Sequence, residues 1–172
     1  MAAMTDPDLA RAIRRRWPTG VAVVTTATPD GAFRGATVGS LMMLSLEPPT
    51  LAFALATESA FHTLLTEGHP FAVAIVDRSG EFLADRFAGR APVPDARFGG
   101  VPYAMTEVAG GKVPVLSGAA VLAWMGCTVT AKTVVGDHAL ILGEIAAGAV
   151  GDDTDDPLLF YEGHYRGLEV QR

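Results

Sequence analysis

Hydrophobic and polar residues follow one another in short blocks whose period changes along the chain. In the first block, Leu9, Ile13 and Trp17 recur every four residues after Asp6, which suits the start of a helix. This spacing predicts a short amphipathic helix near the N-terminus. The arginines of residues 11–16 (RAIRRR) fall between the apolar positions, so we interpret them as the solvated face of that helix.

Most of the other apolar blocks have a period of two, which is typical of β-strands. Val21, Val23 and Thr25 alternate in register ahead of a Pro-Asp-Gly turn at 29–31, and this pattern predicts a hairpin. Two buried strands are predicted over residues 50–56 and 71–77, and two long strands over 119–134 and 137–150, with Gly136 in the turn between the long pair.

Two further helices are predicted between these strands. The first covers residues 60–67 and is expected to end at Gly68. The second is expected to begin after Ser79 as its N-cap and to end at Gly89. Residues 90–118 are rich in proline and glycine and have little periodicity, so we expect a long irregular excursion of the kind that often covers a site.

These blocks amount to six or seven strands with two or three short helices, which favours an antiparallel barrel over a doubly wound sheet. A chain of 172 residues is expected to form a single domain, 1–172, around one core. Hydrophobic residues make up 49% and charged residues 19%, which excludes a disordered chain. No two of the 19 glycines are spaced two apart, so the G-x-G-x-x-G of a Rossmann fold is absent.

Charge and cysteine content narrow the function classes. The net charge of −6 argues against a nucleic-acid partner. The single cysteine, Cys127, excludes an internal disulfide and predicts a reducing compartment. No apolar run reaches the about 20 residues that span a bilayer, so we expect no membrane association and a cytoplasmic location. The scattered histidines and the adjacent acids of 152–156 predict no metal site.

Four polar residues are candidates for chemistry, although each also has an ordinary structural interpretation. Thr37 and Ser40 lie in "GATVGSLMMLSLEPP", where hydroxyls and backbone N–H groups at a bend either bind an anion or heteroaromatic edge, or only form a turn. Ser59 either caps the following helix or binds phosphate at its start. His138 follows a Gly-Asp pair at the start of a strand and, taken alone, is typical of the solvent edge of a hairpin.

Eight segments taken in order resemble the flavin reductase-like family, whose members supply reduced flavin to two-component monooxygenases. They are "WPTGVAVVTT" (17–26), "GATVGSLMMLSLEPP" (35–49), "FAVAIV" (71–76), "LADRFAG" (83–89), "RFGG" (97–100), "VPVLSGAAVLAWMGC" (113–127), "GDHALILGEI" (136–145) and "PLLFYEGHYRGL" (157–168). The resemblance implies a six-stranded antiparallel split β-barrel with Greek-key topology that binds FMN, or less often FAD, near the interface of a homodimer. NADH or NADPH is the implied electron donor, and a flavin-dependent monooxygenase is the implied partner.

The resemblance also implies which residues bind the flavin. These cofactor-binding positions are Thr37, Val38, Gly39, Ser40, Leu41, Met42, Ser59, Phe61, Arg86 and Phe87. Among them, Thr37, Gly39 and Ser40 match positions along the ribityl chain and phosphate, and Leu41 and Met42 match positions beside the isoalloxazine ring.

The resemblance also implies roles for three residues at the phosphate of the flavin and near the nicotinamide. Ser59 matches a serine on the phosphate side, and Arg86 lies on the helix whose basic residue often reaches the phosphate. His138 matches the histidine of the family's G-D-H and is expected near the nicotinamide as the catalytic residue. The chain departs from the family at Gly39, where serine or threonine is common, so more of the hydrogen bonds to the flavin are expected to come from the backbone.

Together these features predict an NAD(P)H-dependent flavin reductase that passes hydride from the nicotinamide to FMN or FAD. Two alternatives remain, the first another enzyme and the second from a different class. One is a flavin-bound oxidoreductase that acts on another small substrate, because a fold does not fix the reaction. The other is a flavin-binding or partner-docking protein without turnover of its own.

Overall fold

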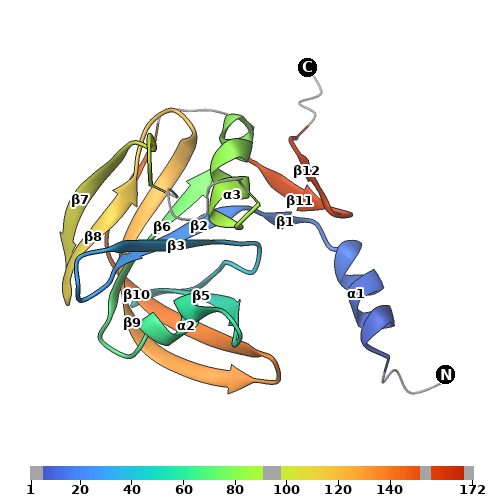
Figure 1. Cartoon of the computed structure of the whole chain (residues 1–172), viewed down its shortest axis with the longest axis horizontal. Coiled ribbons are helices and arrows are strands. Elements are labelled where there is room, and N and C mark those ends of the chain that lie inside the picture. The colour runs from blue at the N-terminus through green and yellow to red at the C-terminus, as the bar shows by residue number, and fades with distance from the viewer. Residues whose placement is uncertain (1–5, 91–97, 152–155, 169–172) are drawn as a thin grey trace.

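β-Strands dominate the computed structural model, which describes residues 6–90, 98–151 and 156–168 (Figure 1). The helices are α1 (Pro7–Arg15), α2 (Ala60–Leu64) and α3 (Glu81–Phe87), with a 3-10 turn at Arg78–Gly80. The strands are β1 (Thr19–Gly20), β2 (Ala22–Ala27), β3 (Phe33–Val38), β4 (Met42–Leu46), β5 (Pro49–Ala56), β6 (Pro70–Val76), β7 (Tyr103–Val108), β8 (Gly111–Leu116), β9 (Val121–Val135), β10 (His138–Val150), β11 (Leu159–Tyr161) and β12 (His164–Arg166). None of the helices in the described ranges has the length and apolar character that crossing a membrane requires.

The main sheet has seven strands in the order β3-β2-β6-β9-β10-β5-β4, and every neighbouring pair is antiparallel. Strand β5 lies beside β10 rather than β6, so the chain crosses over between distant strands, as in a Greek key. Two small sheets, β1-β11-β12 and β7-β8, complete the described strands. The predicted class, an antiparallel split barrel with few short helices, is confirmed, although the main sheet has one strand more than the predicted six.

Strand β2 is buried on both faces, whereas a simple alternation of inward and outward residues was predicted from Val21, Val23 and Thr25. Val23 belongs to a cluster that includes Phe87 of α3, and Val24 belongs to the opposite cluster around Phe53. Both faces are covered because the cluster that includes α3 packs on one side of β2 and the larger core cluster packs on the other. The period-two pattern therefore located the strand correctly but did not reveal its second buried face.

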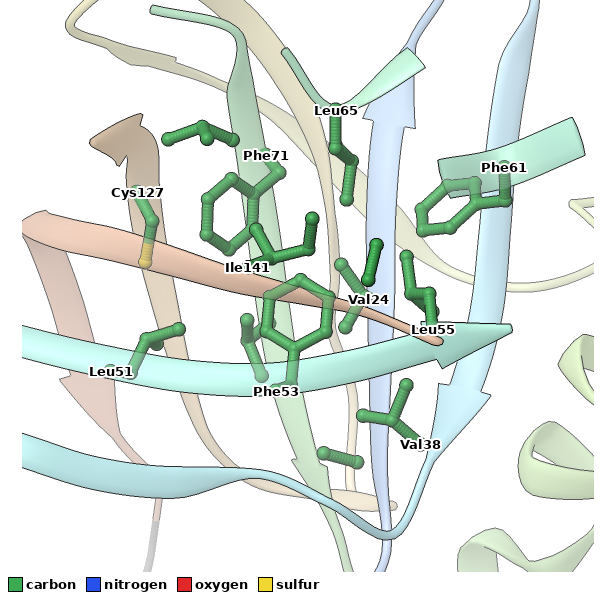
Figure 2. Packing of buried hydrophobic residues seen from close by; sticks show 14 residues of the cluster. Val24, Val38, Leu51, Phe53, Leu55, Phe61, Leu65, Phe71, Cys127 and Ile141 are labelled. Atoms are coloured by element: carbon green, nitrogen blue, oxygen red, sulfur yellow. The ribbon is translucent and has the colours of Figure 1, made fainter. Parts of the chain in front are cut away.

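The larger cluster fills the interior between the curved strands, with Phe53 and Phe71 at its centre (Figure 2). Their ring centroids lie 5.6 Å apart in an edge-to-face arrangement. Ile141 of β10 and Phe61 of α2 complete the contact between the sheet and the short helix. The side chains of this cluster pack against β5, and residues at the end of β5 line the site described next.

Cys127 lies inside the same cluster and is completely buried (Figure 2). Burial raises the pKa of its thiol to about 12, so the reactive thiolate is absent near neutral pH. We expect the native protein to resist modification by iodoacetamide and the urea-unfolded protein to take up one equivalent. Mass spectrometry measures both states, and rapid modification of the native protein would contradict this burial.

Both predicted internal helices form, but with different boundaries and capping. Helix α2 stops at Leu64 because Leu65 leaves helical geometry, so Gly68, with its φ of +80°, lies in the loop beyond rather than at the helix end. At the second helix the predicted N-cap Ser79 is wrong. The N-cap of α3 is Gly80, which makes no side-chain capping bond. Asp77 caps the preceding 3-10 turn by accepting the N–H of Gly80, and the Ser79 hydroxyl donates to the Asp77 carboxylate at 2.7 Å.

The predicted irregular excursion at 90–118 contains a regular hairpin, β7-β8, so that prediction is wrong for this part. Gly110 and Gly111 turn the hairpin with φ of +94° and +141°, which glycine adopts readily. Val113 and Val115 then pack against Ala72 of β6, so tertiary burial sustains strands that sequence periodicity does not indicate. Residues 91–97, and residues 152–155 of the acidic run 152–156, lie outside the described residues.

Helix α1 forms as predicted, with the Asp6 side chain accepting from the N–H of Asp8. The apolar residues of this segment are also exposed in the single chain, since Leu9, Ile13 and Trp17 are 43%, 53% and 73% exposed. The helix extends away from the strands at one side of the molecule (Figure 1).

Candidate active site

A cavity of about 1030 Å³ opens where the β3–β4 connection, the end of β5, α1 and the β11-β12 hairpin meet. Its walls carry aliphatic side chains, hydroxyls, arginines and aromatic rings. The lining residues are Arg14, Arg15, Trp17, Thr19, Val21, Ala36, Thr37, Val38, Gly39, Ser40, Ala54, Leu55, Ala56, Ser59, Phe61, Phe87, Ala88, Arg90, His138, Phe160, Glu162, Gly163 and Tyr165. The volume lies at the upper end of the range of about 300–1,000 Å³ typical of small-molecule and cofactor sites.

Ser40 ties the β3–β4 connection to β5. Its hydroxyl accepts the N–H of Ala54 at 2.9 Å and donates to the carbonyl of Ala54 at 3.1 Å. The side chain therefore replaces a strand partner at a point where β4 has not yet begun. Because the hydroxyl proton is already used, the contribution of this segment to a ligand comes more from the backbone than from the serine side chain.

We expect Ser40→Ala to weaken flavin binding, because the connection loses both bonds to Ala54 and its backbone donors are no longer held in place. The unfolding free energy should fall by about 0.5–1.5 kcal/mol, the usual net contribution of a hydrogen bond. Ser45→Ala is the matched control, since Ser45 lies on β4 outside the cavity. A flavin titration that gives equal dissociation constants for both variants would show that Ser40 does not organise the site.

Strand pairing brings His138 to the same cavity. His138 is paired with Ala56 across the β10-β5 ladder, three residues before Ser59. Both the N–H and the hydroxyl of Thr57 donate to the carbonyl of Asp137, at 2.9 and 3.0 Å, across eighty positions of sequence. The end of the β9-β10 hairpin is thereby fixed against the end of β5.

The orientation of His138 is set by its neighbour. Its Nδ1 lies 2.7 Å from Oδ1 of Asp137, and this hydrogen bond, followed by the charge interaction, lowers the pKa of Asp137. Because an ionised carboxylate only accepts, Nδ1 must carry the proton and Nε2 is left to the ligand. A neutral His138 therefore presents an acceptor at Nε2, and a protonated His138 presents a donor.

Ser59 caps α2, as one of its two interpretations predicted. Its side chain accepts the N–H of Phe61 at 3.2 Å, and its carbonyl contacts Nδ1 of His62 at 2.8 Å. Capping uses a lone pair of the hydroxyl and not its proton. Ser59 also lines the cavity, so its hydroxyl can cap the helix and donate to an anionic ligand at the same time.

Helix α3 reaches the cavity through Phe87, and Thr37 of β3 lines the cavity beside it. The hydroxyl of Thr37 donates to the carbonyl of Ala84 at 2.7 Å, which fixes β3 to the helix. The ring of Phe87 lies on Gly35, where an added Cβ would come within 2.6 Å of the ring. While it holds Ala84, the Thr37 hydroxyl can accept from a ligand hydroxyl but has no proton left for a phosphate oxygen.

Gly39 leaves room for β1. A Cβ built on Gly39 would lie 2.7 Å from Oγ1 of Thr19, which lines the same cavity. A serine or threonine here would have to displace Thr19. The Thr19 hydroxyl of β1 therefore occupies the space that a side chain at Gly39 would take.

Eight of the eleven predicted site residues line this one cavity: Thr37, Val38, Gly39, Ser40, Ser59, Phe61, Phe87 and His138. The other three do not. Leu41 packs against the larger core cluster and Met42 is half exposed on β4. Arg86 donates to the carbonyl of Gly99 at 2.5 Å and does not line the cavity.

Several lining residues were missed by the sequence reasoning. Arg14 and Arg15 were interpreted as solvated, yet they line the cavity because α1 is attached to the tip of the β11-β12 hairpin. Arg90, rather than Arg86, supplies a cationic side chain from the α3 region. The sequence signal was present in "PLLFYEGHYRGL", whose Phe160 and Tyr165 also line the cavity, but no role followed from it.

Comparison with known proteins identifies the family. Residues 14–169 match the family described as "Flavin reductase like domain", which is most of the chain. The chain therefore belongs to the flavin reductase-like family, as its resemblance predicted.

Individual relatives align with this chain over most of the length of both proteins. The chain is 36% identical over 168 residues to "Flavin reductase (NADH)" of Kitasatospora aureofaciens, covering 98% of this chain and 85% of that protein. It is 29% identical over 173 residues to "Flavin-dependent monooxygenase, reductase subunit HsaB" of Mycobacterium tuberculosis, covering 100% and 88%. The solved NADH:FAD oxidoreductase SgcE6 of Streptomyces globisporus C-1027 superposes with a TM-score of 0.83 at 27% identity, over 100% and 95% of the two chains. SgcE6 has also been solved with NAD and FAD fragments.

Proposed function

We propose that this protein is an NAD(P)H-dependent flavin reductase that reduces FMN or FAD and supplies the reduced flavin to a partner monooxygenase. The observation that carries the proposal is the convergence of the β3–β4 connection, Ser59 and His138 on one large cavity. Relatives of similar length are named as NADH-dependent flavin reductases or as the reductase subunit of a monooxygenase, which supports the same activity.

The residues of the cavity fit a flavin. Val38, Ala54 and Phe61 offer apolar surface to a flat ring, and the Ser59 hydroxyl retains a proton for a phosphate oxygen. Thr37 can accept from a ribityl hydroxyl while it holds Ala84. This is the mixture of apolar walls and a few fixed polar groups that cofactor sites use.

A bound flavin would supply the hydride acceptor for the reduced nicotinamide, so the chain itself would need no strong acid or base. The protein contributes by holding the flavin and the nicotinamide close together and correctly oriented. Asp137 holds the ring of His138, whose Nε2 then orients the nicotinamide. Backbone N–H groups around residues 39–42 are available to stabilise negative charge on a ring edge, and Phe61 and Phe87 exclude water from the cavity wall.

We also propose that the protein is a single-domain homodimer in which a second copy covers β4. This edge strand of the main sheet exposes Met42, Met43, Leu44 and Leu46, and Leu46 is 85% exposed. Exposed apolar edge strands are normally covered, because they otherwise pair with other chains. Light scattering should give twice the chain mass, and Met43→Glu should give the monomer.

We also propose a cytoplasmic location, which the free thiol of Cys127 supports.

NADH oxidation, followed by its near-ultraviolet absorbance with and without added FMN, tests the main proposal. Rapid oxidation that requires FMN is the expected result. Oxidation that depends on another small substrate, without free flavin, would indicate a different oxidoreductase. Flavin binding without any turnover would indicate a binding or docking protein, and a flavin titration without saturation would overturn the proposal entirely.

A further inference from the structure

Gly39, in the connection between β3 and β4, is a glycine because of the space around it and not because of its backbone conformation. Its φ lies outside the left-handed region, so the backbone there does not require a glycine. Among the described residues, only one atom would lie too close to an added Cβ, and that atom is Oγ1 of Thr19 at 2.7 Å. The next two, Cβ of Thr19 and the carbonyl oxygen of Gly20, would lie at 3.6 and 3.7 Å, which are ordinary contacts. The Thr19 hydroxyl alone therefore excludes a side chain at residue 39.

The Thr19 hydroxyl keeps its proton for a ligand. Thr19 is half-buried on β1 and lines the large cavity. Its backbone is held by pairing with Phe160 of β11, and within the described part of the chain its hydroxyl makes no hydrogen bond. A β-branched side chain has few rotamers, so little conformational freedom is lost when this hydroxyl binds a ligand.

The neighbouring hydroxyls on this side of the cavity have already used their protons. Thr37 donates to the carbonyl of Ala84, and Ser40 donates to the carbonyl of Ala54. Each can still accept from a ligand, but neither can donate without breaking its bond to the backbone. Thr19 is therefore the side chain beside the β3–β4 connection that is free to donate to an acceptor oxygen.

We infer that Thr19 is a flavin-binding residue whose hydroxyl donates to an acceptor oxygen of the flavin, and that Gly39 is needed to leave this hydroxyl in place. FMN offers acceptor oxygens on its phosphate, its ribityl chain and its ring carbonyls. The inference rests on the proposed function, because it names a further contact between this chain and the flavin. It gives a role to β1, none of whose residues was predicted for the site.

Fluorescence titrations of single variants test the role of the hydroxyl. Thr19→Val keeps the shape of the side chain and removes the hydroxyl, so it should weaken FMN binding about tenfold, the effect of losing one hydrogen bond to a charged oxygen. Thr19→Ser keeps the hydroxyl and should bind FMN as the wild type does. Thr106→Val is the matched control, because Thr106 is a half-buried threonine of β7 outside the cavity.

Riboflavin, which lacks the phosphate of FMN, separates the sources of the acceptor oxygen. Equal riboflavin affinity in the wild type and Thr19→Val, together with the loss of FMN affinity, assigns the contact to the phosphate. A parallel loss of riboflavin affinity assigns it to the ring or the ribityl chain.

A double-variant cycle tests the contact between residues 19 and 39. Gly39→Ser alone places a Cβ against Oγ1 of Thr19, so the hydroxyl must turn away and FMN binding should weaken. In a Thr19→Ala background the nearest remaining atoms lie at 3.6 and 3.7 Å, so the new serine fits and supplies a hydroxyl beside the vacated position. The same Gly39→Ser substitution should then strengthen FMN binding. A reversal of sign indicates direct coupling between the two residues, whereas two independent structural roles give weakening in both backgrounds.

Several results would overturn the inference. These are an FMN dissociation constant for Thr19→Val equal to that of the wild type, loss of FMN binding in Thr19→Ser, and weakening by Gly39→Ser in both backgrounds. A raised KM for NADH in Thr19→Val with unchanged FMN affinity would also overturn it, because the hydroxyl would then serve the nicotinamide. Failure of the wild type to bind FMN would instead overturn the proposed function.

Discussion

We expect the His138→Ala variant to oxidise NADH about ten to a hundred times more slowly than the wild type in the presence of FMN. Loss of an orienting contact misplaces the reacting atoms, and small misplacements have effects of this size. The dissociation constant for FMN should change little, because the ring-binding segments on β5 and the β3–β4 connection are held by Ser40 and not by His138. Steady-state kinetics and a fluorescence titration measure the two quantities separately.

Two further variants show whether this effect belongs to the site. His164→Ala is the control, because His164 is an exposed histidine of β12 that does not line the large cavity. Asp137→Asn keeps an acceptor beside Nδ1 but loses the charge, so its loss of rate should be smaller than that of His138→Ala. Wild-type rates in His138→Ala would remove His138 from the mechanism.

The largest stability effect is expected for Phe53→Ala. Phe53 is completely buried and packs edge-to-face on Phe71 in the cluster that supports β5. Removing a buried phenylalanine costs about 3–5 kcal/mol, because transfer energy is lost and a cavity remains. The midpoint of urea unfolding should fall accordingly, and flavin binding should weaken as the end of β5 loosens.

Phe82→Ala is the matched control for this substitution. Phe82 lies on α3 and is 55% exposed, so the same change in chemistry should alter the unfolding free energy by less than about 0.5 kcal/mol. Equal unfolding midpoints for Phe53→Ala and Phe82→Ala would contradict the packing shown in Figure 2.

Local sequence patterns predicted most of the strands because each pattern reports an environment that repeats within one element. The hairpin of β2 and β3 turns at the predicted Pro-Asp-Gly, and the hairpin of β9 and β10 turns at Gly136, whose φ is +61°. The β7-β8 hairpin was missed because the burial that sustains it comes from β6, far away in sequence. The predicted cap Ser79 lies within a 3-10 turn that Asp77, two residues earlier, caps, and only the backbone geometry shows that this turn precedes the helix.

For the site, the family resemblance selected residues and the fold decided which of them meet. Thr37, Ser40, Ser59 and His138 line one cavity, whereas Arg86 turns to Gly99 and Arg90 takes the position at the wall. A helix of seven residues presents its side chains all around its axis, so sequence alone does not determine which arginine near its end reaches a ligand.

The sequence by itself determined the mainly antiparallel β class, the principal turns, and a set of polar segments ordered as in one family. These depend on local periodicity and turn chemistry, which a residue's near neighbours fix. Only the tertiary structure decided that β5 joins Ser40 to His138, and that α1 directs arginines toward the cavity while its apolar stripe stays exposed. Those relations depend on strand register and on contacts such as Arg15 with Glu162, 147 positions apart, which no local pattern encodes.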